Sequence, residues 1–290
     1  MMQPIWAKLS PEEHEFQYNP QHAFPDFAKA RAKRAPYNDR AREALTVTAD
    51  VPFGAHALRR LDIYPAAKAD APVHVFIHGG YWRAQDKANF AFIAGALVPH
   101  GITTVIVNYE LCPASTLDGV VDSAIAGFGW IARNIGAHGG DPARITLSGH
   151  SAGAHLGAAI MAHDWPEPTA MGLTGVVLTS GIYDPAPAIH TSVNAQLNLD
   201  AAIAARHNVE RRAPVLRPDV TILAGAGEPD QFVDQSFRYY HNLRAHGFEP
   251  ALHVLAGYDH FNILDEYLDA DSVTMRTILR QCGVAKEGRP

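Results

Sequence analysis

The feature that most constrains the fold is a series of short apolar runs separated by long helical patterns. These runs cover residues 73–78, 103–109, 145–149, 175–180, 220–225 and 251–257. Strands that are apolar on both faces are typical of parallel sheets whose two faces are both covered by helices. The runs therefore predict a mostly parallel sheet in the α/β class.

Helical patterns fill the intervals between the runs and follow the last of them. They cover residues 88–101, 117–140, 152–163, 231–247 and 262–283. Two further strands are predicted at 44–50 and 57–65, joined by a turn. An opening hairpin followed by strand–helix alternation predicts one doubly wound sheet of about eight strands with helices on both faces.

Composition excludes several classes of protein. The 290 residues include 24 basic and 30 acidic side chains, and the acidic balance argues against a nucleic-acid binder. No uninterrupted apolar stretch reaches about 18 residues, so we expect no membrane span. Two cysteines, Cys112 and Cys282, cannot form a disulfide framework, and the first residues lack a secretory-signal pattern. We therefore expect a cytoplasmic protein.

Two segments stand apart from the alternating pattern. Prolines punctuate residues 1–42, which contain the basic helical stretch 27–35, and we expect an N-terminal extension that packs on the main domain. Residues 43–290 are expected to form a single domain. Within it, residues 184–217 have no clear strand, which predicts a lid or cap over the site, or simply a long connection.

The segment GHSAG, residues 149–153, contains a candidate nucleophile. A serine hydroxyl is a poor nucleophile unless a base accepts its proton and the backbone presents it outward. Ser151 lies between a predicted strand and a predicted helix, where a strained turn can expose it. We therefore predict that Ser151 is the nucleophile rather than a passive serine in a glycine-rich turn.

A second glycine motif, HGGYW at residues 78–82, follows the first apolar run. Adjacent glycines leave backbone N–H groups free to point into a site, and acyl transfer needs such donors where negative charge develops on the carbonyl oxygen. We predict that the N–H groups of Gly79, Gly80 and Ala152 form this oxyanion hole. The alternative is a tight turn that only reverses the chain.

A base and an acid should follow the serine in the order serine, acid, histidine. His260 lies in a loop between the last predicted strand and the last predicted helix, from which it can reach Ser151. The other histidines lie within helices or strands, too early in the chain, or in the serine turn itself. We therefore predict that His260 is the base.

Two carboxylates follow the strand predicted at 220–225, and either could be the acid. Glu228 and Asp230 flank Pro229, so their side chains point differently and only one can serve. A carboxylate in this place fixes the histidine tautomer and stabilises the imidazolium. Aspartate is the commoner residue in this role, so chemistry alone favours Asp230.

Together these segments resemble the kynurenine formamidase (arylformamidase) family of α/β-hydrolases, within the group of esterases that carry an HGG motif. The matching segments are HGGYW (78–82), TLDGVVD (116–122), GHSAGAHL (149–156), SGIYD (180–184), the QS pair (235–236), DHF (259–261) and FQYNP (16–20). HGG and GHSAG alone mark only the esterase group, whereas HGGYW with SGIYD and the QS pair is more specific. The resemblance implies the α/β-hydrolase fold and a homodimer.

The resemblance also bears on the acid. In these relatives the acid lies four residues before a phenylalanine that precedes the QS pair by two intervening residues. That phenylalanine is Phe232 here, so the corresponding acid is Glu228, a glutamate in place of the commoner aspartate. The resemblance therefore favours Glu228 over Asp230, against the argument from chemistry.

The activity implied by the resemblance is hydrolysis of N-formyl-L-kynurenine to L-kynurenine and formate, in tryptophan degradation, through an acyl-enzyme. Tyr81, Trp82, Tyr183 and Phe261 could form an aromatic wall of the substrate pocket, and the alternative is that aromatic residues beside glycine turns only pack the structure. No residue type indicates a site for the amino-acid end of this substrate. No cofactor is expected, and the histidines form no metal-binding motif.

Three alternatives are kept. The protein could be a carboxylesterase or aryl amidase that uses the same triad on short acyl esters or amides. It could also be a non-catalytic binding protein on a hydrolase scaffold, or an interaction module built on the basic stretch 27–35.

Overall fold

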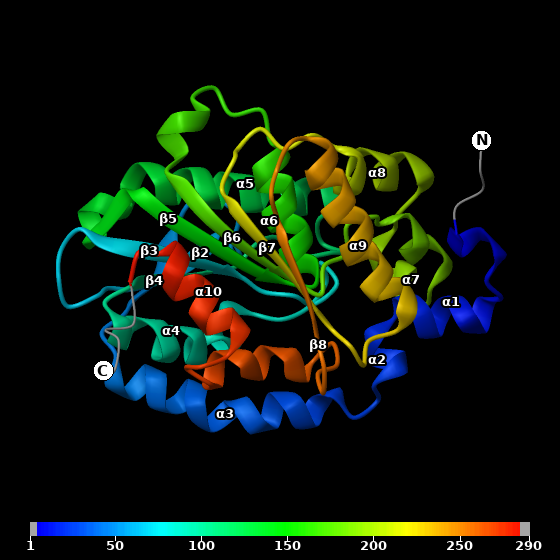
Figure 1. Ribbon diagram of the computed structural model, residues 1–290, viewed down its shortest axis with the longest axis horizontal. Helices are drawn as coiled ribbons and strands as arrows, with labels where there is room; N and C mark the ends of the chain where they lie inside the picture. The colour runs from blue at the N-terminus through cyan, green and yellow to red at the C-terminus, as the bar shows by residue number, and fades with distance from the viewer. Residues whose placement is uncertain (1–4, 285–290) are drawn as a thin grey trace.

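The computed structural model describes residues 5–284, and its centre is one eight-stranded sheet (Figure 1). The strand order is β1-β2-β4-β3-β5-β6-β7-β8. The strands are β1 (Thr48–Pro52), β2 (Arg60–Tyr64), β3 (Ala71–Ile77), β4 (Thr103–Val107), β5 (Gly140–His150), β6 (Leu173–Thr179), β7 (Asp219–Gly225) and β8 (Ala251–Leu255). β2 pairs antiparallel with β1 and β4, and all the other neighbours are parallel. The prediction of a mostly parallel α/β sheet of about eight strands is confirmed.

Helices cover both faces of this sheet. One face carries α5 (Leu117–Asn134), α6 (Ala152–Ala162) and α9 (Asp230–Ala245), and the other carries α3 (Phe27–Ala44), α4 (Ala91–Leu97) and α10 (Val273–Gln281). The shorter helices are α1 (Pro11–Tyr18), α2 (Pro20–Ala23), α7 (Asn194–Leu197) and α8 (Ala201–Arg206). Single 3₁₀ segments are η1 (Ile5–Lys8), η2 (Lys87–Asn89), η3 (Val98–His100), η4 (Ile135–His138), η5 (Pro168–Met171), η6 (Ala186–His190), η7 (Val209–Arg211) and η8 (Asn262–Leu268). Within residues 5–284, none of the helices combines the length and apolarity needed to cross a membrane.

Side-chain alternation along β3 divides the interior into two cores. Val73, Val75 and Ile77 belong to the core on the side of α5 and α6, whereas Phe76 belongs to the core on the side of α4 and α10. Successive residues of a strand point to opposite faces, so a strand between two helix layers must be apolar in both phases. This is the physical origin of the continuous apolar runs in the sequence.

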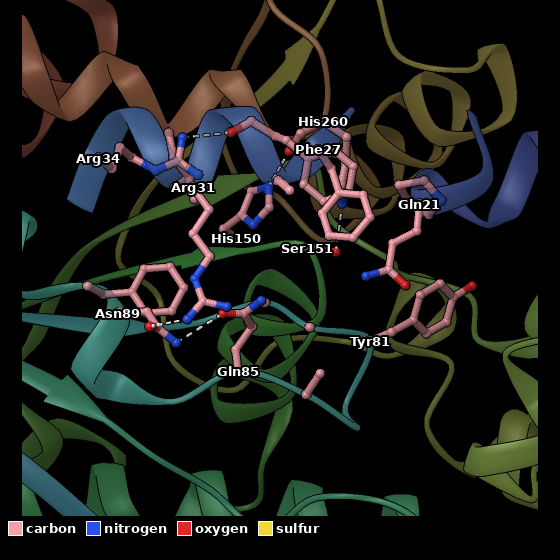
Figure 2. A pocket seen from close by; sticks show the side chains of 18 of the residues that line it. Gln21, Phe27, Arg31, Arg34, Tyr81, Gln85, Asn89, His150, Ser151 and His260 are labelled. Carbon is pink, nitrogen blue, oxygen red and sulfur yellow. Dashed lines mark hydrogen bonds between the residues drawn. The ribbon is translucent and has the colours of Figure 1, made fainter. Parts of the chain in front are cut away.

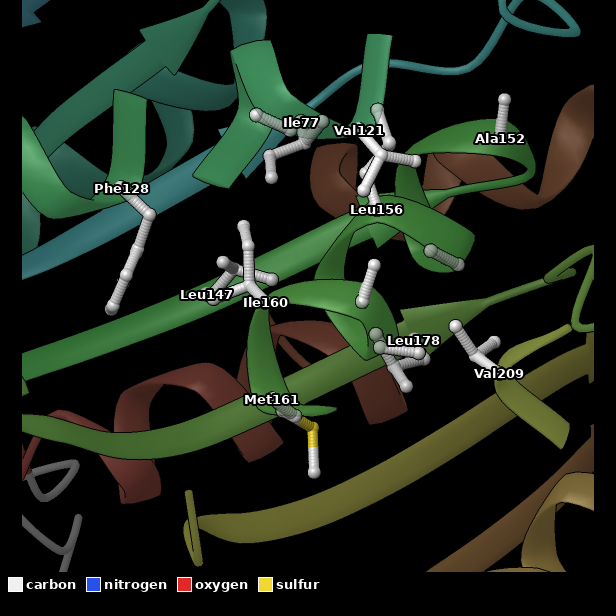
Figure 3. Close-up of a cluster of buried hydrophobic side chains, with 14 of the residues drawn as sticks. Ile77, Val121, Phe128, Leu147, Ala152, Leu156, Ile160, Met161, Leu178 and Val209 are labelled. Carbon is white, nitrogen blue, oxygen red and sulfur yellow. The ribbon is translucent and has the colours of Figure 1, made fainter. Parts of the chain in front are cut away.

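Helix α6 is buried along its whole length because it lies between the sheet and the outer helices. All eleven of its residues are buried. Figure 3 shows Leu156 and Ile160 of this helix among Leu147 of β5 and Leu178 of β6. A helix that is apolar all round is stable only where every side is covered.

The N-terminal segment places α3 outside α4 on the second face of the sheet and α1 against α9 and η6 (blue in Figure 1). Its main element, α3, contains Pro36 and continues to Ala44, so the expected boundary at residue 42 falls within the last turn of this helix. Arg34 of α3 is buried, donates to the carbonyl of Phe261 at 2.9 Å and pairs with Asp265 at 2.9 Å. The extension is therefore tied to the loop that follows β8.

The last helical pattern is interrupted, contrary to the prediction of one helix over 262–283. The structure has η8 and α10 with a break between them. Ser272 caps α10, because its hydroxyl accepts from the Met275 N–H at 3.0 Å, and the Glu266 carboxylate accepts from the Thr274 N–H at 3.1 Å. Serine is a favoured N-cap residue, and this local signal outweighs the apolar periodicity.

Two valines test how much the parallel core contributes to stability. Val176 of β6 is completely buried, whereas Val254 of edge strand β8 is 40% exposed. Val176→Ala should lower the free energy of unfolding by about 2–3 kcal/mol, because two buried methyl groups are lost and a cavity remains. Val254→Ala should change it by less than about 0.5 kcal/mol. Urea denaturation of both variants measures this, and equal losses would contradict the packing described.

A buried polar chain crosses the second core behind β3. His74 Nδ1 lies 2.8 Å from the Thr146 hydroxyl, and His74 Nε2 lies 2.7 Å from the Ser148 hydroxyl. The Ser148 hydroxyl also accepts from the Tyr267 hydroxyl at 2.8 Å. Burial lowers the pKa of His74 to about 3. The imidazole is therefore neutral in the folded protein at neutral pH.

This histidine should make the protein less stable in acid. An unfolded histidine has a pKa of about 6.5, so between about pH 6.5 and 3 the unfolded chain binds a proton that the folded protein excludes. The free energy of unfolding should therefore decrease as the pH is lowered through this window. The decrease from His74 alone is up to about 1.4 kcal/mol per pH unit. His74→Gln should make the slope shallower by that amount, whereas His253→Gln, at an exposed position, should not. Unchanged slopes in both variants would contradict the assignment.

Candidate active site

Ser151 occupies the turn between β5 and α6 with an unusual backbone conformation. Its φ of 56° and ψ of −118° are sparsely populated for a residue with a side chain. The Ser151 N–H donates to the carbonyl of Thr179 at 2.8 Å, which ties the turn to the end of β6. A Cβ at Gly153 would lie 2.0 Å from the carbonyl oxygen of Ile77, so α6 can approach β3 this closely only with glycine there.

Ser151, His260 and Glu228 form a continuous hydrogen-bonded relay. The Ser151 Oγ lies 3.0 Å from His260 Nε2, and His260 Nδ1 lies 2.7 Å from Glu228 Oε2. All three side chains are buried. Because a carboxylate can only accept, the proton of the neutral imidazole belongs on Nδ1, and Nε2 is then free to accept from the serine.

The structure joins Glu228, and not Asp230, to this histidine. Glu228 is held by a second pair of contacts, since its Oε1 accepts from the Gly225 N–H at 2.7 Å and from the Ser180 hydroxyl at 2.6 Å. Asp230 is exposed at the first residue of α9. Ser180 begins the segment SGIYD, but nothing in the sequence alone indicates that its hydroxyl binds Glu228.

The two glycines after β3 turn their N–H groups away from the core. The Tyr109 hydroxyl donates to the carbonyl of His78 at 2.8 Å, and His78 Nδ1 lies 2.7 Å from the carbonyl of Gly79. In a trans peptide the N–H points opposite to the C=O, so the N–H groups of Gly79 and Gly80 point away from the Tyr109 hydroxyl and the His78 ring, and both residues line the cavity. Ala152 begins α6, and a first-turn N–H has no acceptor within its own helix.

A cavity opens over Ser151 between the loops and the N-terminal segment (Figure 2). Of the four predicted wall residues, Tyr81 and Phe261 line it. Trp82 and Tyr183 do not: both are completely buried, with Trp82 donating to His155 Nδ1 at 3.2 Å and Tyr183 stacked on Tyr239 at 4.3 Å between ring centroids. These two aromatic residues pack the core, so their assignment to the pocket is corrected.

The N-terminal segment supplies one wall of this cavity. Pro20, Gln21, Phe27, Ala28, Arg31 and Arg34 all line it. The ring of Phe27 lies 5.2 Å from that of Phe261, and the Tyr81 hydroxyl donates to the carbonyl of Tyr18 at 2.7 Å. This role is not predictable from the sequence, because nothing in a basic helical stretch specifies which surface it covers.

Residues 184–217 fold beside α6 and α9 as η6, α7, α8 and η7. In the part of the chain that the structure describes, no residue of this segment lines the cavity. Its buried side chains, including Leu197, Val209 and Leu216, join the first core. The cover over Ser151 therefore comes from the N-terminal segment.

His150, next to the serine, holds the loop of His260 in place. Its Nε2 lies 2.7 Å from the carbonyl of His260. Burial, reinforced by the neighbouring His260, holds the pKa of His150 well below its usual range, so it is a neutral donor to that carbonyl. Across residues 5–284, no group of histidine, cysteine and carboxylate side chains has an arrangement that could hold a metal ion.

Comparisons with known proteins agree with this fold. Residues 74–264 match a family model described as alpha/beta hydrolase fold. The chain is 29% identical to a kynurenine formamidase of Danio rerio over 292 residues, which cover 96% of this chain and 98% of the relative. It is 29% identical to a kynurenine formamidase of Drosophila melanogaster over 231 residues, or 74% of this chain and 75% of the relative.

Solved structures show the same fold. A Silicibacter protein described as a candidate thioesterase superposes with a TM-score of 0.82 at 23% identity, covering 91% of this chain and 98% of its own. An esterase of Pyrobaculum calidifontis superposes with a TM-score of 0.72 at 20% identity, covering 96% and 99%. At these identities the likeness establishes the architecture alone.

Proposed function

The chain belongs to the α/β-hydrolase family and is a hydrolase, and on that premise we propose that it cleaves an N-formyl aryl amide through an acyl-enzyme on Ser151. The proposed substrate is N-formyl-L-kynurenine, and the products are L-kynurenine and formate. The observation that carries the proposal is the relay from Ser151 through His260 to Glu228, which opens into a cavity with aromatic walls. The relatives named kynurenine formamidase support the choice of substrate.

In the first half of the reaction, Ser151 Oγ attacks the formyl carbon while His260 Nε2 accepts the hydroxyl proton. The carbonyl oxygen becomes an oxyanion, which the N–H groups of Gly79, Gly80 and Ala152 stabilise. The C–N bond then breaks, and His260 returns the proton to the leaving aryl amine. Glu228 stabilises the imidazolium throughout, because its carboxylate is buried against Nδ1.

In the second half, water replaces the amine. His260 Nε2 accepts a proton from the water as its oxygen attacks the formyl ester of Ser151, and the collapse of the second tetrahedral intermediate returns that proton to the serine oxygen. Formate leaves, and the free enzyme is restored. The aromatic rings of Tyr81, Phe27 and Phe261 suit an aryl leaving group, since flat apolar surfaces favour stacking.

The homodimer and the cytoplasmic location stay predictions, and gel filtration of the purified protein tests the homodimer.

Deformylation is the direct test of this proposal. The wild-type protein should hydrolyse N-formyl-L-kynurenine with a higher kcat/KM than short p-nitrophenyl esters. Ser151→Ala should lower kcat/KM by about 10⁴-fold or more, because the nucleophile is removed. The absorbance of released kynurenine measures deformylation by the wild type and by Ser151→Ala, and the absorbance of released p-nitrophenolate measures ester hydrolysis. Fast ester hydrolysis with negligible deformylation would instead identify a carboxylesterase, and covalent labelling of Ser151 by a fluorophosphonate separates either enzyme from a non-catalytic binding protein.

The acid assignment has its own matched pair of variants. Glu228→Gln keeps the shape but removes the charge that holds the His260 tautomer, so kcat should fall by about 10²- to 10⁴-fold. Asp230→Asn should change kcat by less than about twofold, because this exposed side chain lies outside the relay. Steady-state kinetics on one substrate compares them, and a larger loss in Asp230→Asn would refute the assignment of Glu228.

A further inference from the structure

The charges around the cavity are strongly unbalanced. Three arginines line it, namely Arg31, Arg34 and Arg83, and among the residues described no aspartate or glutamate does. An excess of cationic side chains around a site attracts anions and repels cations. The feature belongs to the candidate active site itself, since Ser151 and His260 line the same cavity.

The three guanidinium groups differ in what already binds them. Arg34 is neutralised by Asp265 at 2.9 Å. Arg83 donates to the amide oxygens of Gln21 and Gln196 through its two terminal nitrogens, and its Nε is buried without a partner among the described residues. The charge of Arg34 is therefore paired, whereas Arg83 is held between two neutral amides, which leaves three of its five N–H donors unused.

Arg31 has the largest number of unused donors of the three. It is exposed, and the structure gives it one hydrogen bond, from Nη2 to Asn89 Oδ1 at 2.8 Å. A guanidinium has five N–H donors. Figure 2 shows Arg31 reaching from α3 to Asn89, beside Gln85, in the cavity that Ser151 also lines. A neutral partner leaves the positive charge uncompensated.

The amide partner also orients this guanidinium. Asn89 Nδ2 donates to Gln85 Oε1 at 3.2 Å, so the oxygen of the Asn89 amide is the atom that faces Arg31. The Asn89 backbone carbonyl in turn accepts from the Asn38 side chain at 2.7 Å, which joins this loop to α3. A pre-oriented planar guanidinium is well suited to bidentate binding of a carboxylate.

We infer that Arg31 binds a carboxylate on the substrate, so that the site selects aryl amides or esters whose part remote from the scissile bond is negatively charged. The inference rests on the proposed function, and it names the residue that recognises the amino-acid end of such a substrate. The N-terminal segment is then part of the binding site, because the selecting side chain comes from α3.

Matched substrates isolate this interaction. Formanilide and 3-formamidobenzoate are aryl formamides without and with a carboxylate, and phenyl acetate and 3-acetoxybenzoate are the corresponding esters. The readout is the ratio of kcat/KM on the carboxylated compound to that on the neutral one. Arg31→Gln should lower this ratio by about tenfold or more, which corresponds to the loss of one charge-assisted hydrogen-bonded pair. Arg31→Lys keeps the charge without the planar fork and should lower it less.

Lys29→Gln is the matched control. It removes the same charge from the same helix, but Lys29 is 79% exposed, pairs with Asp26 and does not line the cavity. Its ratio should equal that of the wild type. An unchanged ratio in Arg31→Gln, or an equal fall in Lys29→Gln, would overturn the inference.

The two substrate pairs keep this test separate from that of the proposed function. Turnover of the esters without the formanilides would refute formamidase activity, while the ester ratio would still decide the role of Arg31. Calorimetric binding of benzoate to the Ser151→Ala protein decides it without any turnover. The dissociation constant should rise about tenfold when Arg31→Gln is added, and equal binding with and without that change would overturn the inference.

Discussion

The close contact between the start of α6 and the end of β3 is the constraint on which the site depends. Gly153 lets the helix pass against the carbonyl of Ile77, where any side chain would collide with the backbone. This contact places the strained Ser151 beside the two glycines that follow β3. The nucleophile and the N–H groups proposed to stabilise its oxyanion therefore come from one packing arrangement between neighbouring parallel strands.

Burial then converts a set of loops into an ordered relay. Glu228 receives a backbone N–H and the Ser180 hydroxyl at one oxygen, so its other oxygen is directed to His260. His150 donates to the backbone carbonyl of the same residue, His260. A carboxylate and two imidazoles can be buried together here because both carboxylate oxygens and both nitrogens of His260 are hydrogen-bonded and His150 Nε2 donates to a carbonyl.

Much of this arrangement was predictable from local patterns. The continuous apolar runs require a sheet covered on both faces, and the glycines around Ser151 require a close turn. The interruption near Ser272 is a local capping signal that the apolar periodicity hides. The choice between Glu228 and Asp230 was harder, because it depends on a contact with His260, which is distant in the sequence. Trp82 and Tyr183 belong to the segments HGGYW and SGIYD, which favours a place in the pocket, but burial against His155 and Tyr239 places them in the core.

The sequence by itself determined the fold class, the candidate nucleophile and the candidate base, because strand periodicity and turn chemistry are local properties of the chain. Only the tertiary structure decided what surrounds them. The N-terminal segment becomes a wall of the cavity because Arg34 and Asn38 join α3 to the loops near Phe261 and Asn89. Such contacts span more than 50 residues of sequence, and no local pattern encodes which partner a solvated basic helix will find.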